Sequence, residues 1–179
     1  NIPSQTNILA TYKQVDAGKK FTLALRADGT VWAWGDNTYG VLGQGNRVSA
    51  RKPVQVQSLT NIVAISAGDN HAIALDSLGN VYTWGLNSSG QLGNGNTQTV
   101  RSRRQRQMCI RDRTVSVPEK INSIGNQIVG VSAGGNLSAI VDSTGAVYVF
   151  GDNSKEQIEP FKYNYDEFGQ KILPALNTY

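Results

Sequence analysis

A repeat of about fifty residues is the feature that most constrains this chain. The segment at residues 18–37 returns at residues 68–87 and again at residues 134–153, with the same order of glycine, aromatic and asparagine positions. A unit that recurs in this way is a structural module stacked on copies of itself, rather than a single active site.

Each copy contains a short segment with aromatic side chains on one face and small or β-branched side chains on the other. In the first copy, Trp32 and Trp34 alternate with Val31 and Ala33, which is the period of a β-strand. A strand that is apolar on both faces should be covered on both faces, as in a sheet packed between two others. We therefore expect these aromatic side chains to be largely buried between neighbouring sheets: Trp32, Trp34, Tyr82, Trp84, Tyr148 and Phe150.

Three more strands are expected in each repeat. One precedes the aromatic segment and is joined to it by a glycine-containing turn, and one upstream is rich in Ala, Ser and Gly. A fourth follows and begins at Pro53 or Pro118, which suits an edge strand because proline lacks an N–H. Four antiparallel strands per repeat predict an all-β chain of β-propeller blades, with a β-solenoid as the alternative.

The recurrence also separates structural positions from catalytic ones. His71 is the only histidine, and the same slot holds Phe21 and Leu137 in the other copies. These three residues share size and packing but not proton transfer. We expect no catalytic, cofactor-binding or metal-binding residues, and assign a structural role to these repeat positions: Gly18, Gly35, Gly68, His71, Gly85, Gly134, Gly151, Trp34, Trp84 and Phe150.

Other candidate motifs are better explained as turns. The glycines at residues 40–45 and 90–95 superficially suggest a phosphate-binding loop, but the order of the spacing is reversed and no Lys-Thr pair follows. Asp36 and Asp152 suggest calcium, but Leu86 replaces the acid in the middle copy, so turn capping is expected instead.

The net charge of +4 has a single source, residues 101–113. Removing the six arginines and one aspartate of this segment from the 17 basic and 13 acidic residues changes the net charge to −1. The segment also holds the only Cys and the only Met. Deleting residues 101–115 restores the spacing of the repeat and joins Val100 directly to Ser116.

Three explanations of this segment stay open: a basic arm that binds nucleic acid, a solvated loop, and a stretch foreign to the gene. The residues Met108 to Arg113 can be encoded by the codons ATG TGT ATA AGA GAC AG. This nucleotide string resembles the transposon end used to make sequencing libraries. This interpretation accounts together for the Cys, the Met, the arginine cluster and the broken period. We favour it, and therefore expect no specific nucleic-acid partner for Arg101 to Arg113.

The middle copy carries a pattern that resembles the regulator of chromosome condensation repeat family. It reads Ala-Gly-x-x-His-x-x-Ala-Leu at residues 67–75, then Gly-x-Val-Tyr-x-Trp-Gly-x-Asn-x-x-Gly-Gln-Leu-Gly-x-Gly at residues 79–95. The resemblance covers roughly residues 12–158 and decays in the third copy, where Glu156 and Glu159 replace two glycines. It implies a β-propeller, usually of seven blades.

Seven blades of fifty residues would need about 350 residues, so this chain of 179 residues is expected to hold about three. We expect propeller repeats at residues 1–160, with blades at 11–57, 61–121 and 127–160, and a diverged tail at 161–179. Because the chain begins at Asn1 rather than methionine, the natural N-terminus should lie upstream, and the compartment, secreted or cytoplasmic, stays open. No apolar window approaches a membrane span, so no membrane partner is expected.

The resemblance implies several functions, because members of the family differ in their partners. Some exchange nucleotide on a small GTPase and dock on chromatin, some are secreted bacterial proteins that inhibit enzymes, and some are scaffolds. The repeat builds the blade and does not name the partner. Our first hypothesis is a non-catalytic module that binds an unidentified protein partner. The alternatives are a guanine nucleotide exchange regulator of a small GTPase and a carbohydrate-binding propeller.

Overall fold

The computed structural model describes residues 11–94, 114–121, 127–152 and 154, together with the pairs 164–165 and 171–172. All secondary-structure elements of these residues are β-strands. The described residues contain no helix of the length and hydropathy that crossing a bilayer requires.

The strands form three consecutive antiparallel sheets. The first sheet has the order β1-β2-β3-β4, with strands Tyr12–Ala17, Phe21–Arg26, Val31–Gly35 and Ala50–Gln55. The second has the order β5-β6-β7-β8, with strands Ile62–Ala67, His71–Asp76, Val81–Leu86 and Thr114–Lys120. The third has the order β9-β10-β11, with strands Ile128–Gly134, Leu137–Asp142 and Val147–Gly151. Two-residue strands β12 (Asn164–Tyr165) and β13 (Lys171–Ile172) pair with each other.

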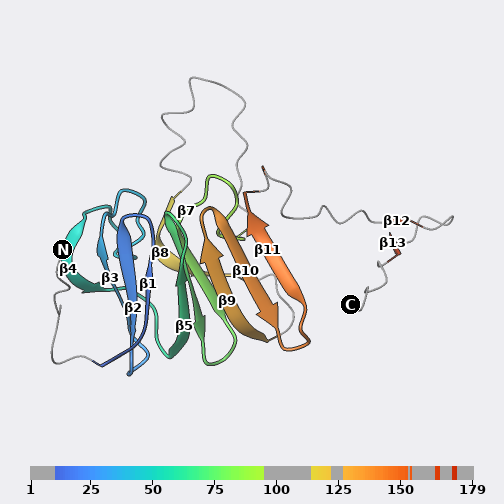
Figure 1. Cartoon of the computed structure of the whole chain (residues 1–179), viewed down its shortest axis with the longest axis horizontal. Helices are drawn as coiled ribbons and strands as arrows, with labels where there is room; N and C mark the ends of the chain where they lie inside the picture. Colours follow the sequence, from blue (N-terminus) through green and yellow to red (C-terminus); the bar gives the residue numbers. More distant parts are fainter. Residues whose placement is uncertain are drawn as a thin grey trace, which may run out of the picture.

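The three sheets lie side by side, face against face (Figure 1). One apolar cluster fills the space between the first and second sheets, with Leu23, Val31 and Ile65 among its members. A second cluster, with Ile73, Val81 and Ile140, lies between the second and third. The predicted all-β architecture of four-stranded antiparallel sheets, each packed on its neighbour, is confirmed for the first two repeats.

The hairpin between the second and third strands of each sheet turns at a glycine. Gly29, Gly79 and Gly145 have φ values of 81°, 83° and 87°, which residues with a Cβ rarely adopt. In the first sheet, Arg26 N donates to Thr30 O at 2.9 Å and Gly29 N donates to Arg26 O at 3.1 Å. The expected reason for these glycines, a positive φ in a tight hairpin, is confirmed.

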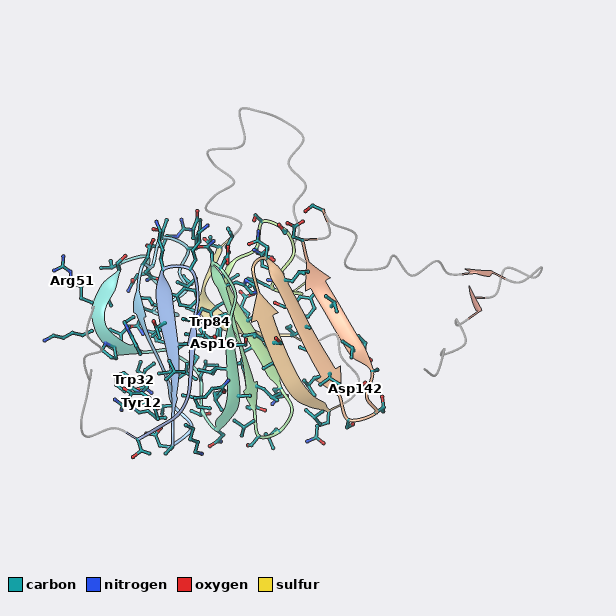
Figure 2. The ribbon with its side chains drawn as sticks, viewed as in Figure 1. Tyr12, Asp16, Trp32, Arg51, Trp84 and Asp142 are labelled. Atoms are coloured by element: carbon teal, nitrogen blue, oxygen red, sulfur yellow. The ribbon has the colours of Figure 1, made fainter. Side chains whose placement is uncertain are left out.

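The expectation that all six aromatic side chains are largely buried is wrong for Tyr148. Trp84 is fully buried and its Nε1 donates to Val41 O at 2.7 Å, but Tyr148 is 41% exposed. Trp32, Trp34, Tyr82 and Phe150 are only half-buried. The aromatic face of each sheet points toward the preceding sheet, and among the described residues no sheet precedes the first (Figure 2). Tyr148 lies on β11, which is an edge strand because the described third sheet has no fourth strand.

The fourth strand starts earlier than expected, so its proline lies inside the strand. Gly35 pairs with Ala50 and Ala33 pairs with Val54, so two residues along β3 span four along β4. Pro53 falls in this irregular stretch, and Pro118 occupies the corresponding place in β8. A bulge on an edge strand tolerates a residue without an N–H, which explains both prolines.

The predicted loop at residues 101–115 is wrong for its last two residues. Thr114 pairs with Leu86 and Val115 with Gly85, so both belong to β8. The sequence offered a second solution, because Thr99-Val100 and Thr114-Val115 are identical dipeptides. Deleting residues 99–113 and deleting 101–115 give the same polypeptide. The remaining residues, 101–113, lie outside the described part of the chain.

We expect the chain lacking residues 99–113 to keep or exceed the thermal stability of the full chain. Shortening a loop costs little entropy, and either Thr-Val dipeptide supplies the same start of β8. Thermal denaturation of the two chains measures this directly, and binding to duplex DNA at low salt should disappear with the arginines. A large loss of stability, or recovery of the same codons from independently prepared genomic DNA, would contradict a foreign origin.

Candidate functional site

His71 lies in the interior between the second and third sheets. It is fully buried, and its Nε2 lies 2.9 Å from Ser138 Oγ. Since Ser138 Oγ donates its own hydrogen to Gln91 O at 2.8 Å, the hydrogen between the two side chains must come from His71 Nε2. Nδ1 has no hydrogen-bond partner. Burial lowers the pKa of His71 from 6.5 to about 4, so the ring is neutral near pH 7.

The equivalent positions in the first two sheets show why this slot changes between copies. Phe21, in the slot of His71, belongs to the same apolar cluster as Ala72, which is the equivalent of Ser138. The first interface therefore has an apolar pair where the second has a hydrogen-bonded pair. This exchange of both partners together is the pattern of a packing contact between sheets.

We expect the stability of the chain to fall as the pH decreases from about 6.5 to 4, and to lose this component in His71→Phe. The folded state holds the neutral ring, so the unfolded chain binds a proton first, at its ordinary pKa near 6.5. The stabilisation is thus present above pH 6.5 and is lost as the pH falls toward 4, by an amount on the order of 3 kcal/mol. Urea denaturation at a series of pH values measures it.

The double variant His71→Phe/Ser138→Ala is the matched control, because it installs the pair that the first interface already uses. It should be close to wild type at pH 7 and flat between pH 6.5 and 4. A steep loss of stability in that window despite the substitution would show that another group is responsible.

Two glycines of the repeat are required because another chain segment approaches closely. A Cβ on Gly85, which has a φ of 104°, would lie 2.6 Å from Asn70 O. A Cβ on Gly68 would lie 2.1 Å from Cε1 of His71, so the ring rests directly on this backbone. A Cβ on Gly18 would likewise lie 2.1 Å from Cε1 of Phe21. Gly35 and Gly151 repeat the situation of Gly85, whereas a Cβ on Gly134 would meet nothing within 4 Å.

Two long loops, residues 36–49 and 87–94, lie at one edge of the stack together with the short turns at 18–20 and 68–70. We call these four segments the loop rim. Asn37 is fully buried there, and its Oδ1 accepts from Leu42 N at 2.9 Å while its Nδ2 donates to Val48 O at 3.1 Å. Asn87 repeats this, accepting from Leu92 N at 3.1 Å. An asparagine ends the repeated segment in all three copies, and this recurrence was the sequence signal for a buried loop anchor.

Asp36 shapes the first turn of the same loop. Its Oδ1 accepts from Thr38 N at 2.9 Å and from Thr38 Oγ1 at 2.6 Å, and these bonds hold the pKa of the carboxyl below its usual value. Asp152 accepts from Ser154 N at 2.9 Å in the third copy. The predicted capping role is confirmed. Among the described residues, no group of three or more His, Cys, Asp or Glu side chains is placed to hold a metal ion.

A hollow of about 230 Å³ opens at the loop rim between the first and second sheets. Its lining combines two cations, one carboxylate, a hydroxyl, a ring and an amide: Lys19, Lys20, Asp36, Thr38, Tyr39 and Asn70. Lys19 also lies 4.0 Å from Asp69, in an exposed pair that adds little stability. This part of the rim therefore has mixed charge.

A larger and shallower hollow, about 670 Å³, lies beside β4 and is lined by Trp32, Gln44 and residues 53–60. On the same face, the guanidinium of Arg26 lies 3.6 Å from the centre of the Trp32 ring and 5.6 Å from the centre of the Tyr12 ring. Figure 2 shows Tyr12 and Trp32 close together. The equivalents of Arg26 are Asp76 and Asp142. This cluster is specific to the first sheet, and sequence comparison between copies could have found it as a change of charge.

Family comparisons place residues 12–157 in one class of repeat. The regulator of chromosome condensation (RCC1) repeat matches residues 28–75 and 79–141, and a second form of the same repeat matches 12–41, 62–91 and 128–157. The human E3 ubiquitin-protein ligase HERC2 is 38% identical over 64 residues, which are 34% of this chain and 1% of that protein. The ultraviolet-B receptor UVR8 of Arabidopsis thaliana is 41% identical over 44 residues, 25% of this chain and 10% of the receptor.

Solved structures show the same fold. Human WBSCR16 has a TM-score of 0.69 and 19% identity, covering 84% of this chain and 35% of its own. The structure of Kap60 bound to yeast RCC1 (Prp20) gives a TM-score of 0.66 and 24% identity, covering 79% and 32%. This chain thus spans about a third of these structures and a small part of the curated relatives. Since the repeat matches more than half of its residues, the chain belongs to the regulator of chromosome condensation (RCC1) repeat family and folds as an incomplete β-propeller.

Proposed function

We propose that this chain is a non-catalytic protein-interaction module that contacts its partner through the loop rim. The observation that carries the proposal is a contrast within the loop rim: the asparagines that hold the loops are the same in both copies, whereas the residues after them differ. Asn37 and Asn87 hold two successive loops by the same buried hydrogen bonds. The residues that follow them, Thr38-Tyr39 and Ser88-Ser89, differ between copies. A rigid frame that carries variable loops suits recognition of a protein surface.

The interior supports the absence of catalysis. In this proposal the repeat positions are structural, since His71 is buried with a neutral ring and Gly68 and Gly85 have a neighbouring segment against them. The matched region is also only 1% of HERC2, so the ligase activity in the name of that protein does not carry over.

The exchange-regulator alternative rests on relatives alone. Prp20p from Saccharomyces cerevisiae, a protein with binding properties to Gsp1p and histones, has a crystal structure with a TM-score of 0.61 and 25% identity, covering 78% of this chain. Release of labelled GDP from a small GTPase tests this alternative, and a non-catalytic module leaves the release rate unchanged. The carbohydrate alternative would need exposed aromatic side chains on loops. Among the described residues, Tyr148 is the exposed aromatic side chain, and it lies in a strand.

A site-specific photocrosslinker distinguishes the loop rim from the rest of the surface. We expect a photoreactive phenylalanine at Lys20, beside the hollow, to capture a protein from an extract of the source cells, and Lys19→Glu to weaken the capture. The matched control is the same group at Leu78, which is 77% exposed in a hairpin at the opposite edge. Capture of the same protein at equal yield from both positions, or no protein adduct at position 20, would refute the loop rim as the binding surface.

A further inference from the structure

The hollow of about 230 Å³ at the loop rim has walls that backbone hydrogen bonds hold together. Lys19 N donates to Asp69 O at 3.1 Å, which joins the turns of the first and second sheets. Asp36 N donates to Lys20 O at 2.9 Å, which ties the start of the long loop to the first of these turns. Tyr39 packs against the apolar cluster between the two sheets. The walls therefore come from two neighbouring sheets and are fixed relative to one another.

Several hydrogen-bond donors around this hollow are not used within the fold. In the described part of the chain, the side chains of Lys20, Tyr39 and Asn70 make no hydrogen bond or salt bridge with other residues. Lys19 Nζ lies 4.0 Å from Asp69 Oδ2, which is too far for a hydrogen bond. Since an ammonium, a phenol and an amide all carry hydrogens to donate, the hollow offers donors that a ligand can satisfy.

The carboxylate in the same hollow is already engaged. Oδ1 of Asp36 accepts from Thr38 N at 2.9 Å and from Thr38 Oγ1 at 2.6 Å, so this side chain braces the loop. The lining holds two ammonium groups and one carboxylate, a net charge of +1. This balance attracts an anion with a single negative charge. It suits a phosphate group less well, because such a group carries nearly two negative charges at pH 7 and meets the carboxylate of Asp36.

The corresponding place between the second and third sheets lacks these cations. Counted by the repeat, the equivalents of the six lining residues are Asp69, Asn70, Leu86, Ser88, Ser89 and Asn136. They include one acid and no lysine, which gives a net charge of −1. The cationic hollow is therefore specific to the first interface and is not a requirement of the repeat. Variation at a loop position on a constant frame is typical of recognition rather than of packing.

We propose that this hollow binds one carboxylate side chain, of a glutamate or an aspartate, on the surface of the protein partner. The inference rests on the proposed function, since it names the chemistry that the loop rim recognises. A volume of about 230 Å³ lies below the ~300–1,000 Å³ of small-molecule sites, so it suits a single inserted side chain. The carboxylate accepts from Lys20 Nζ, the Tyr39 hydroxyl and the Asn70 amide, while Lys19 adds its charge.

NMR spectroscopy of the full chain tests this with the α-amide of N-acetylglutamate, whose side-chain carboxylate is its only charge. We expect saturable shifts of the backbone amides at residues 19–20 and 69–70, with a dissociation constant on the order of 10 mM, as fits one inserted side chain. The α-amide of N-acetylglutamine has the same shape without the charge. It should bind roughly fivefold more weakly, the difference expected for one partly exposed charge pair.

Substitutions that install the residues of the second interface give the matched variants. Lys19→Asp and Lys20→Asn should each weaken binding of the glutamate analogue, and the double variant should abolish its saturable shifts. Both side chains are exposed, so the variants should fold, and circular dichroism checks this. Asp36→Asn keeps an acceptor for Thr38 and removes the negative charge, so it should strengthen binding. Lys52→Asn, which removes an exposed lysine of β4 outside the loop rim, should leave binding unchanged.

The proposal is overturned by equal binding of the glutamine analogue, by tighter binding of inorganic phosphate than of the glutamate analogue, or by unchanged binding in Lys20→Asn. The largest shifts outside residues 19–20, 36–39 and 69–70 would also overturn it. The photocrosslinker replaces Lys20 itself, so capture at that position reports where the partner lies and does not need this ammonium. The binding surface and the chemistry of its hollow can therefore fail separately.

Discussion

Replacing Trp84 by alanine should lower the free energy of unfolding by about 3–5 kcal/mol, the typical cost of removing a fully buried large aromatic side chain. Trp84 is 0% exposed in the cluster between the first and second sheets. Its loss also leaves Val41 O without the indole N–H that now lies 2.7 Å away. Since a domain of this kind is stable by only about 5–15 kcal/mol, the middle sheet should unfold readily. Urea denaturation followed by tryptophan fluorescence and circular dichroism measures the change.

Trp34→Ala is the matched control, because Trp34 occupies the same repeat position in the first sheet and is half-buried. This variant should lose less than about 2 kcal/mol. Equal losses of unfolding free energy for the two variants would mean that Trp34 is covered as completely as Trp84, contrary to the burial described above.

Gly68→Ala should destabilise the chain by about 1–3 kcal/mol, the usual cost of overpacking a core. The new Cβ would lie 2.1 Å from Cε1 and 2.4 Å from Nδ1 of His71, and 2.9 Å from Gly135 O. The imidazole cannot move aside easily, because its Nε2 is bonded to Ser138 and the ring is fully buried. Thermal and urea denaturation of the variant report the loss.

The same substitution at Gly134 gives the control, since a Cβ there meets nothing within 4 Å. Gly134→Ala should change the stability by less than about 1 kcal/mol, with a small gain from the lower entropy of the unfolded chain. A second check is Gly68→Ala/His71→Ala, which removes the clashing ring and should recover part of the loss relative to His71→Ala alone. Equal effects at Gly68 and Gly134 would show that these glycines are not selected by the ring.

Much of the fold could be predicted because the repeat compares the chain with itself. The alternation at Val31-Trp32-Ala33-Trp34 predicted the strand, and the recurring glycines predicted the hairpins. The burial of the aromatic side chains was mispredicted because periodicity shows that a face is apolar, but not whether a neighbouring sheet covers it. Trp84 and Trp34 have equivalent sequence positions, and only their places in the stack differ.

Two kinds of feature were harder to predict: the contacts between sheets, and the side-chain contacts that only one copy makes. The bonds from Ala67 N to Asp16 and from Ala133 N to Ser66 join residues 51 and 67 positions apart, and an aspartate and a serine share one role. The stack of Arg26 on Trp32 occurs in one copy, because the other two copies have an aspartate at the position of Arg26. The repeated pattern therefore did not predict it. The start of β8 was misplaced because two identical Thr-Val dipeptides fit it.

Amide hydrogen exchange, followed residue by residue, tests most directly whether this protein is a stack of sheets whose interior positions are structural. The account predicts the slowest exchange in β6, where all six residues are buried, and slow exchange in β2. It predicts much faster exchange in β11, an edge strand whose first three residues are exposed. Protection of β11 equal to that of its repeat equivalents β3 and β7 would contradict the described third sheet, in which β11 is an edge strand.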